Sequence, residues 1–206
     1  MSQNLIQSLR DPKTPPMVIA EIGANHDGSM EKALRMIDQV AAAGAALVKF
    51  QLLSADELVS DPDRMVKLGS PEKPYERTVG ELFDSLAFSK SQMRELFYYA
   101  KSKSLVSFAT PFSLKGVDVL SELQAPLVKI AASDVGNLPL LRKAATLGVP
   151  VILSLGKCTL AEADEAIHCL QDSGCEDLAI LHCIAAYPSP MEQMNLRIIP
   201  VLKELY

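Results

Sequence analysis

Two short apolar segments of this chain each carry a lysine, and a third carries a glutamate. Lys49 lies in ALVKFQ, Lys129 lies in LVKIA, and Glu21 lies in VIAEIG. A charged side chain in a buried strand is costly unless it meets an opposite charge or a hydrogen-bonding partner. Two separate ammonium groups suit a ligand that carries both a phosphate and a carboxylate. These three residues therefore predict a site for an anionic substrate.

The three segments belong to a longer alternation of strand and helix patterns. Short runs rich in Val, Ile, Leu and Ala are typical of strands buried on both faces, and they occur at 18–23, 46–51, 106–110, 127–132, 149–154 and 178–183. Helical patterns lie at 30–43, 91–103, 115–123, 138–147, 159–173 and 195–206. Capping signals support several helices, including Ser29 before the first and Thr159 before the fifth.

Six strand–helix units in a row predict a parallel α/β fold, either an open doubly wound sheet or a (β/α)8 barrel. The barrel is favoured because Glu21, Lys49 and Lys129 fall at or near the carboxyl ends of separate strands, where barrel enzymes carry their catalytic groups. No G-x-G-x-x-G pattern follows the first strand, which argues against dinucleotide binding.

One segment, 54–90, interrupts the alternation because it is polar and contains several prolines. We expect a long loop there, with a short helix near 79–86. Long loops inside compact domains often act as lids over a site.

The charged residues have structural interpretations as well as functional ones. Glu21 could bind a substrate hydroxyl or move a proton, and it could also form an ion pair with a lysine on a neighbouring strand. The lysines could pair with Glu21 and Asp134 instead of a ligand. Ligand binding is favoured, because packing alone rarely places lysines on two separate buried strands. His26, in the loop after Glu21, could contact substrate or cap the turn into the next helix, and its neighbour Asn25 has the same two interpretations.

Further polar residues could complete the site. Gln51 lies two residues beyond Lys49, so it shares the face of that strand and could hydrogen-bond a neutral polar substrate. Thr110 and Ser154 end their strands, where a hydroxyl can bind phosphate or simply form a turn. Tyr187 precedes a proline, which predicts a rigid loop over the site with the phenol available to a sugar.

The cysteines offer one further possibility. None of the four belongs to a C-x-x-C pair, but Cys158 and Cys183 could hold zinc together with His182. Reduced, buried thiols in a cytosolic enzyme are the favoured interpretation. A lone histidine in an apolar strand is typically a hydrogen-bonded core residue.

Composition narrows the class of protein. The chain has 206 residues, of which 49% are hydrophobic, and a net charge of -5. This length can bury a core, and the absence of a basic patch argues against nucleic-acid binding. Its apolar runs are too short to span a bilayer, and its first residues lack the apolar core of a signal peptide. We therefore predict a cytoplasmic protein without a membrane partner.

Six motifs occur in order along the chain: AEIGANHDGS, LVKFQ, FATPF, VKIAASD with NLPLL, PVILSLGK and LHCIAAYPSP. Together they resemble the sialic acid synthase (N-acetylneuraminate synthase) family, which includes spore-coat polysaccharide relatives, from about Met17 to Tyr206. The resemblance implies a (β/α)8 TIM-type barrel. It also implies that C3 of phosphoenolpyruvate adds to the aldehyde of an N-acetylated hexosamine such as N-acetylmannosamine. Water then attacks C2, phosphate leaves, and a nine-carbon 2-keto acid forms.

The resemblance also implies roles for individual positions. Glu21 matches the active-site glutamate. The positions implied to contact phosphoenolpyruvate are Lys49, Thr110, Lys129, Ser154 and Ser133. Ser133 is included because it is adjacent to Ala132, where the family has a serine. Gln51 and Tyr187 match sugar contacts, and Asn25 is the further sugar-binding candidate. The expected cofactor is a divalent metal ion, Mn²⁺ or Mg²⁺, and the candidate assembly is a homodimer.

The chain departs from the family pattern in sequence and in length. Apolar residues stand where the family has hydroxyl or other polar groups at Ala132, Leu155, Ile184 and Ala185. The metal ligands of the family, two histidines on strands 7 and 8, lie beyond the matched segment, so we expect no metal ligand in this chain. We predict an incomplete TIM barrel of about six βα units at 17–206, after an N-terminal extension at 1–16.

Two other functions stay open. The same fold could be a catalytically inactive, truncated barrel that acts as a binding or assembly module. A barrel aldolase that uses Lys49 or Lys129 to form a Schiff base is the third candidate.

Overall fold

The computed structural model describes residues 13–70 and 72–206. The described residues divide into two compact units, which meet in the sequence between Pro126 and Leu127. Unit 1 precedes this boundary and unit 2 follows it. Each unit contains three parallel strands with helices packed on them.

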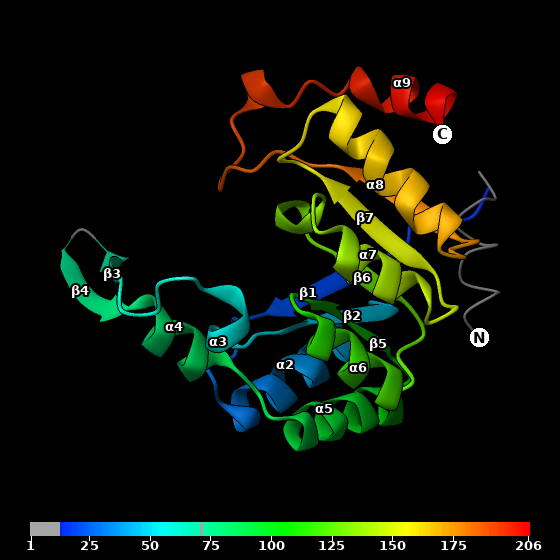
Figure 1. The fold of residues 1–206 in the computed structure, drawn as a ribbon. Coiled ribbons are helices and arrows are strands. Elements are labelled where there is room, and N and C mark those ends of the chain that lie inside the picture. The colour runs from blue at the N-terminus through cyan, green and yellow to red at the C-terminus, as the bar shows by residue number, and fades with distance from the viewer. Residues whose placement is uncertain (1–12, 71) are drawn as a thin grey trace. The chain divides into compact units, whose positions relative to one another are not determined.

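In unit 1 the parallel strands are neighbours in the order β1, β2, β5. Their bounds are β1 (Ile19–Gly23), β2 (Leu47–Leu52) and β5 (Val106–Pro111). The helices packed on them are α2 (Met30–Ala42), α5 (Lys90–Ser102) and α6 (Leu114–Glu122). Figure 1 shows these helices together on one face of the three strands. The opposite face is therefore the one that can carry polar side chains.

The strands of unit 1 form because their apolar residues are buried. In β2 the first four residues are all buried, and Phe50 packs against Phe97 of α5 with 6.0 Å between the ring centroids. The helix starts follow the capping signals in the sequence. Ser29 accepts a hydrogen bond from the backbone of Lys32 at the start of α2, and Ser89 forms a capping box at the start of α5.

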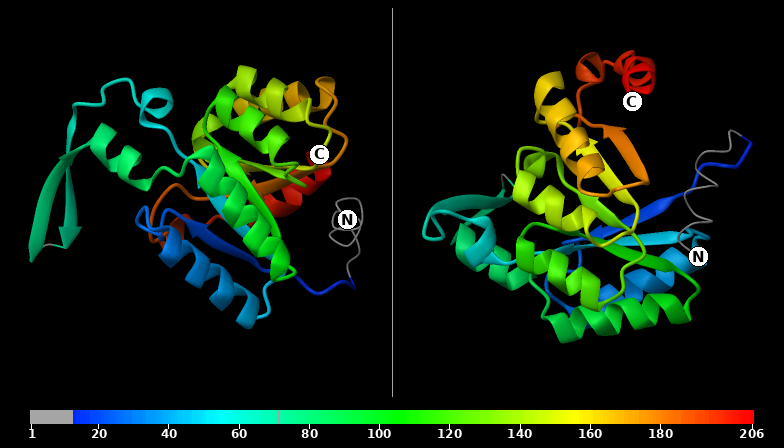
Figure 2. Two further views of the ribbon diagram at one scale, coloured as in Figure 1. Left: turned by 90° about the horizontal axis from the view of Figure 1, so that it is seen from below. Right: turned by 45° about the vertical axis from the view of Figure 1, so that its right-hand side comes forward.

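The segment after β2 is more ordered than the sequence indicated. It contains α3 (Ala55–Leu58), then an antiparallel hairpin of β3 (Met65–Ser70) and β4 (Lys73–Thr78), then α4 (Val79–Leu86). The short helix predicted near its end is confirmed, but the prediction of a long loop is wrong for the hairpin. Figures 1 and 2 show the hairpin extending away from the three parallel strands of unit 1. Its strands bury almost no side chain, so they lack the apolar runs by which the other strands were recognised.

Unit 2 repeats the parallel arrangement with the strand order β6, β7, β8. Its strands are β6 (Val128–Ile130), β7 (Val151–Leu155) and β8 (Leu178–His182). Its helices are α7 (Leu138–Ala145), α8 (Leu160–Asp172) and α9 (Ile198–Leu205), with short 3-10 turns η1 (Ala132–Asp134) and η2 (Met191–Gln193). All five residues of β7 are buried, as expected for a strand covered on both faces.

The strands and helices predicted at every unit of the alternation are present, with boundaries that differ from the predicted ones by up to three residues. The strand predicted at 127–132 ends at Ile130, because the chain turns into η1 and the N–H of Asp134 bonds to the carbonyl of Ala131 at 3.0 Å. The helix predicted at 195–206 begins at Ile198, because Asn195 has a φ of 37° that no helix accommodates.

Two further predictions concern the N-terminal extension and the lack of membrane-spanning helices. Most of the N-terminal extension predicted at 1–16 lies outside the described residues, so that boundary stays a prediction. No helix within 13–70 or 72–206 combines the length and apolar character needed to cross a bilayer.

Candidate functional site

A group of polar side chains lies on β1, β2 and β5 of unit 1, which we call the Lys49 cluster: Glu21, Lys49, Gln51 and Thr110. The strand register places Glu21 beside Lys49, and Gln51 beside Thr110. The ammonium of Lys49 forms an ion pair with Glu21 and donates a hydrogen bond to Thr110 Oγ1 at 3.3 Å. The register that parallel pairing imposes therefore brings residues from three separate segments of the sequence into contact.

Lys49 and Gln51 share one face of β2 because side chains alternate along a strand. Phe50 points the other way, toward α5, so the Lys49 cluster lies on the face away from the helices. Gly23 leaves room for it: a Cβ there would come within 2.8 Å of Glu21 Oε1 and 3.6 Å of Gln51 Nε2. The carboxylate and the amide of these two residues thus lie near the same backbone position.

The ion pair considered in the sequence as the structural alternative for Lys49 is present. Only 11% of the Lys49 side chain is exposed, whereas 46% of the Glu21 side chain is exposed. Glu21 offsets the charge of a nearly buried ammonium, and it also remains accessible from solvent. Lysine has three N–H donors, and the contacts to Glu21 and Thr110 use two of them. A ligand can therefore meet both the ammonium and the carboxylate.

Unit 2 has a second polar group, which we call the Lys129 cluster: Lys129, Ser154 and Cys183. The ammonium of Lys129 donates to Ser154 Oγ and to the carbonyl oxygen of Ile130, the latter at 3.0 Å. The thiol of Cys183 also donates to Ser154 Oγ, with an S···O distance of 3.4 Å. In the strand register Lys129 pairs with Ile152 of β7. Ser154 lies two residues after Ile152, so its side chain is on the same face of β7. Sequence reasoning missed Cys183 as part of this group, although its position directly after a strand was the available signal.

Ser133 lies beside this cluster in sequence, in the η1 turn. Its side chain is exposed, and its hydroxyl donates to Asp134 Oδ2 at 3.1 Å. Burial raises the pKa of Asp134 above its usual range, although hydrogen bonds from Ser133 and Asn137 act in the opposite direction. The contact of Ser133 with phosphoenolpyruvate stays a prediction.

The loop after β1 is stabilised by two of the candidate residues. His26 is buried, stacks on Phe88 with 4.2 Å between ring centroids, and accepts the N–H of Gly28 at its Nδ1, 3.0 Å away. Burial lowers the pKa of His26. The turn-capping interpretation of His26 is therefore confirmed. The amide of Asn25 donates to the carbonyl of Ile22 at 3.0 Å, while its side chain remains exposed, so its sugar contact stays a prediction.

Two further candidates are His182, the last residue of β8, which is partly buried, and Tyr187, which is exposed. His182 Nε2 donates to the carbonyl of Met194 at 2.8 Å, as expected for a hydrogen-bonded histidine in an apolar strand. Tyr187 is 99% exposed, so its phenol is accessible, and its role toward a sugar stays a prediction. In the described part of the chain, no group of three or more His, Cys, Asp or Glu side chains is placed to hold a metal ion. The zinc alternative for Cys158, Cys183 and His182 therefore lacks a site.

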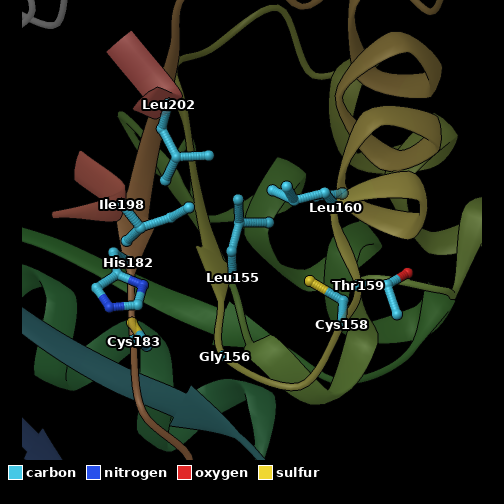
Figure 3. A pocket seen from close by; sticks show the side chains of 10 residues that line it. Leu155, Gly156, Cys158, Thr159, Leu160, His182, Cys183, Ile198 and Leu202 are labelled. Carbon is cyan, nitrogen blue, oxygen red and sulfur yellow. The ribbon is translucent and has the colours of Figure 1, made fainter. Parts of the chain in front are cut away.

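A cavity of about 220 Å³ lies within unit 2, beside the Lys129 cluster. Figure 3 shows its walls, which come from the end of β7, the start of α8, the end of β8 and the α9 helix. Most of the lining is apolar, with Leu155, Leu160, Ile198 and Leu202 among its residues. Cys183 belongs both to this lining and to the Lys129 cluster. Because this lining is mostly apolar, the cavity has few groups that could bind an anion. The two lysine clusters are therefore the better candidates for binding an anionic substrate.

A model of the NeuB family matches residues 36–206 of this chain. The chain belongs to the NeuB family. The resemblance to sialic acid synthases drawn from the six motifs is thereby confirmed. The match covers β2 through α9, which includes every member of both lysine clusters except Glu21.

Individual relatives support the same assignment. The N-acetylneuraminate-9-phosphate synthase of Drosophila melanogaster is 35% identical over 188 residues, which are 90% of this chain and 50% of that protein. The N,N'-diacetyllegionaminic acid synthase of Campylobacter jejuni is 32% identical over 192 residues, which are 92% of this chain and 58% of that protein. The chain therefore spans about half the length of the curated relatives it matches.

A solved structure confirms the fold class. The N-acetylneuraminic acid (sialic acid) synthetase from Leptospira borgpetersenii superposes with a TM-score of 0.80 at 32% identity, covering 93% of this chain and 62% of that one. The fold is α/β, a partial TIM barrel, as predicted. Enzymes of the NeuB family use a divalent metal ion, and the side chains described here do not form a site that fits one.

Proposed function

We propose that this chain is part of a synthase that condenses phosphoenolpyruvate with an N-acetylated hexosamine, such as N-acetylmannosamine. The product would be a nine-carbon 2-keto sugar acid of the sialic acid type, with release of phosphate. Membership of the NeuB family supports this reaction class. The two relatives named above are synthases of two different sugar acids, so family membership alone does not identify the sugar.

The observation that carries the proposal is the Lys49 cluster. It combines a nearly buried ammonium, a half-exposed carboxylate and a neutral amide on one face of a sheet. An ammonium in such surroundings attracts an anion strongly, because little water screens its charge. The carboxylate of Glu21 and the amide of Gln51 suit a polar, uncharged partner such as a sugar. The cluster thus offers groups for both kinds of substrate.

The Lys129 cluster supplies a second cation. The family resemblance implies phosphoenolpyruvate contacts for Lys129 and Ser154, as it does for Lys49 and Thr110, and we propose each of these contacts for this chain. The Leptospira relative was solved in complex with citrate, which is a polycarboxylate.

In the proposed reaction, a bond forms between C3 of phosphoenolpyruvate and the aldehyde carbon of the sugar, whose oxygen takes up a proton. Water adds at C2, and the C2–O bond to phosphate breaks. Lys49 and Lys129 hold the anion and stabilise the charge on the departing phosphate. Glu21 orients the sugar or holds the proton that moves to the aldehyde oxygen. Gln51, Asn25 and Tyr187 are the proposed sugar contacts, and Ser133 is a further proposed contact to phosphoenolpyruvate.

The geometry of Lys49 favours anion binding over the Schiff-base alternative. A Schiff base requires a neutral amine. The ion pair with Glu21 stabilises the charged ammonium instead. Lys49 is therefore better suited to binding an anion than to attacking a carbonyl.

A product assay tests the proposed reaction. The 206-residue chain is mixed with phosphoenolpyruvate and N-acetylmannosamine, with and without Mn²⁺, and both released phosphate and the nine-carbon acid are measured. We expect both products in equal amounts with the native chain, and neither with Lys49→Met. A folded chain that binds phosphoenolpyruvate but releases no phosphate would contradict catalysis and favour the inactive binding module.

A further inference from the structure

Ser154 lies at the centre of the Lys129 cluster, and its hydroxyl oxygen is the acceptor in both of its hydrogen bonds to other side chains. Its side chain is buried, with 5% of its surface exposed. The oxygen of its hydroxyl accepts one hydrogen bond from the ammonium of Lys129 and one from the thiol of Cys183. Both partners are donors, and both belong to unit 2.

A serine hydroxyl has one hydrogen to donate and two lone pairs that can accept. The two donors Lys129 and Cys183 occupy both lone pairs of Ser154. The hydroxyl hydrogen is therefore left for a third group, which has to be an acceptor. Among residues 13–70 and 72–206 no protein group accepts this hydrogen, so an oxygen atom of a bound anion fits this place.

The thiol of Cys183 is the donor in this contact, because sulfur is a weak acceptor and the serine oxygen is a good one. The backbone holds the thiol in position. Cys183 follows β8 directly, and its N–H bonds to the carbonyl of Leu155 at 3.2 Å. Gly156 allows the close approach, since a Cβ there would come within 3.1 Å of the Cβ of Cys183. The thiol is thus directed at Ser154 by the packing of two adjacent strand ends.

We propose that Cys183 is a positioning residue that directs the hydroxyl hydrogen of Ser154 toward the anion bound by Lys129. This inference rests on the proposed function, because it assumes that the Lys129 cluster binds phosphoenolpyruvate. Without the thiol, one lone pair of Ser154 is vacant and the hydroxyl can rotate among several directions. The donor is then no longer preorganised, and ordering it on binding weakens the affinity.

The test compares two substitutions of similar size by calorimetric titration with phosphoenolpyruvate and with inorganic phosphate. Cys183→Ser retains a donor, whereas Cys183→Ala removes it. We expect Cys183→Ala to weaken binding by about 3- to 10-fold, the effect of one hydrogen bond, and Cys183→Ser to remain within about 2-fold of the native chain. Cys158→Ala is the matched control. Cys158 lines the same cavity, on the opposite side from Cys183 in Figure 3, and should leave the affinity unchanged.

A further variant separates positioning from packing. In a chain that already carries Ser154→Ala, adding Cys183→Ala should cost no further affinity, because the hydroxyl to be positioned is gone. Equal affinities of the native and Cys183→Ala chains would overturn the inference, and so would equal losses in Cys183→Ala and Cys158→Ala. If the folded native chain binds neither phosphoenolpyruvate nor phosphate, the proposed function fails, and the inference fails with it.

Discussion

The pairing of Lys49 with Glu21 shows how this protein keeps a cation on a nearly buried strand. The ammonium is largely shielded from water, so it needs a negative partner, and Glu21 supplies one. Because the carboxylate is half exposed, it keeps much of its own hydration. The arrangement offsets the charge of the ammonium and leaves one of its N–H donors for a further partner.

Replacing Glu21 with Gln should therefore destabilise the protein in a way that an anion reverses. We expect a loss of about 1 kcal/mol in the free energy of unfolding, less than for a fully buried pair because Glu21 is half exposed. Inorganic phosphate should raise the melting temperature of Glu21→Gln more than that of the native chain, since it replaces the missing negative charge.

The matched control for Glu21 is Glu31, whose side chain is 83% exposed and whose partner Arg35 is 3.9 Å away. Glu31→Gln should change the stability by less than about 0.5 kcal/mol. Thermal melts of the three chains, with and without phosphate, give both quantities. Equal responses of Glu21→Gln and Glu31→Gln to phosphate would contradict the role of Lys49 as an anion ligand.

His26 makes the stability depend on pH. Burial lowers its folded-state pKa below the unfolded value of about 6.5, and its Nδ1 must stay unprotonated to accept the N–H of Gly28. Between these two pKa values the unfolded chain binds more protons than the folded one. The contribution of His26 is therefore complete above about pH 6.5 and is lost as the pH falls below it, at no more than about 1.4 kcal/mol per pH unit.

Urea unfolding at pH 7.5 and at pH 5.5 measures this loss. His26→Asn keeps an acceptor in the place of Nδ1 but cannot titrate, so the difference between the two pH values should shrink. His168→Asn is the control, because His168 is exposed on α8, where its Nδ1 lies 2.9 Å from the carbonyl oxygen of Asp164. An unchanged pH difference in His26→Asn would show that another group is responsible.

Most of the Lys49 cluster could be predicted from the sequence, because each residue stands out against an apolar segment. Glu21, Lys49 and Thr110 are such exceptions, and parallel pairing brings them together. The hydrogen bond from Cys183 to Ser154 could not be predicted. It depends on how closely two strand ends approach at Gly156, and no pattern in a single segment records that distance.

At the scale of elements, the loop between β1 and α2 packs tightly against α4. Gly28 has a φ of 74°, and a Cβ at this position would lie 2.1 Å from the carbonyl oxygen of Ser85. That oxygen belongs to the backbone, so it cannot move without displacing α4. The loop that follows Glu21 is thereby fixed to a helix of the same unit.

Gly28→Ala should destabilise the protein by about 3 kcal/mol, because it adds a steric clash to an unfavourable backbone conformation. Gly136→Ala is the control, since no heavy atom lies within 4 Å of its added Cβ and its φ is ordinary. Its effect should be near zero or slightly stabilising. Chemical denaturation measures both, and similar stabilities of the two variants would contradict the packing described for this loop.

The elements recognised in advance are those with a buried face. The parallel strands and their helices bury apolar runs, and the periodicity of such runs is visible in the sequence. The β3–β4 hairpin was missed because its strands are mostly exposed and Pro74 lies within β4. A proline in a short polar segment argues against a strand. The strand β4 can therefore be recognised only from its pairing with β3 in the structure.

At the scale of the whole molecule, the fold class followed from the alternation of strands and helices, and the six motifs identified the family. The chain matches about half the length of its curated relatives, so substrate binding and the complete reaction are both proposals for it. The central claim is accordingly that the two lysine clusters bind phosphoenolpyruvate.

The most direct test is a calorimetric titration of phosphoenolpyruvate into the native 206-residue chain, Lys49→Met and Lys129→Met. We expect the native chain to bind and each variant to lose at least about 10-fold in affinity, the effect of one charged hydrogen-bond partner of about 1.5–3 kcal/mol. Lys101→Met, a change on the exposed surface of α5, should bind like the native chain. Native affinity in both Lys49→Met and Lys129→Met, with all chains folded, would contradict the claim.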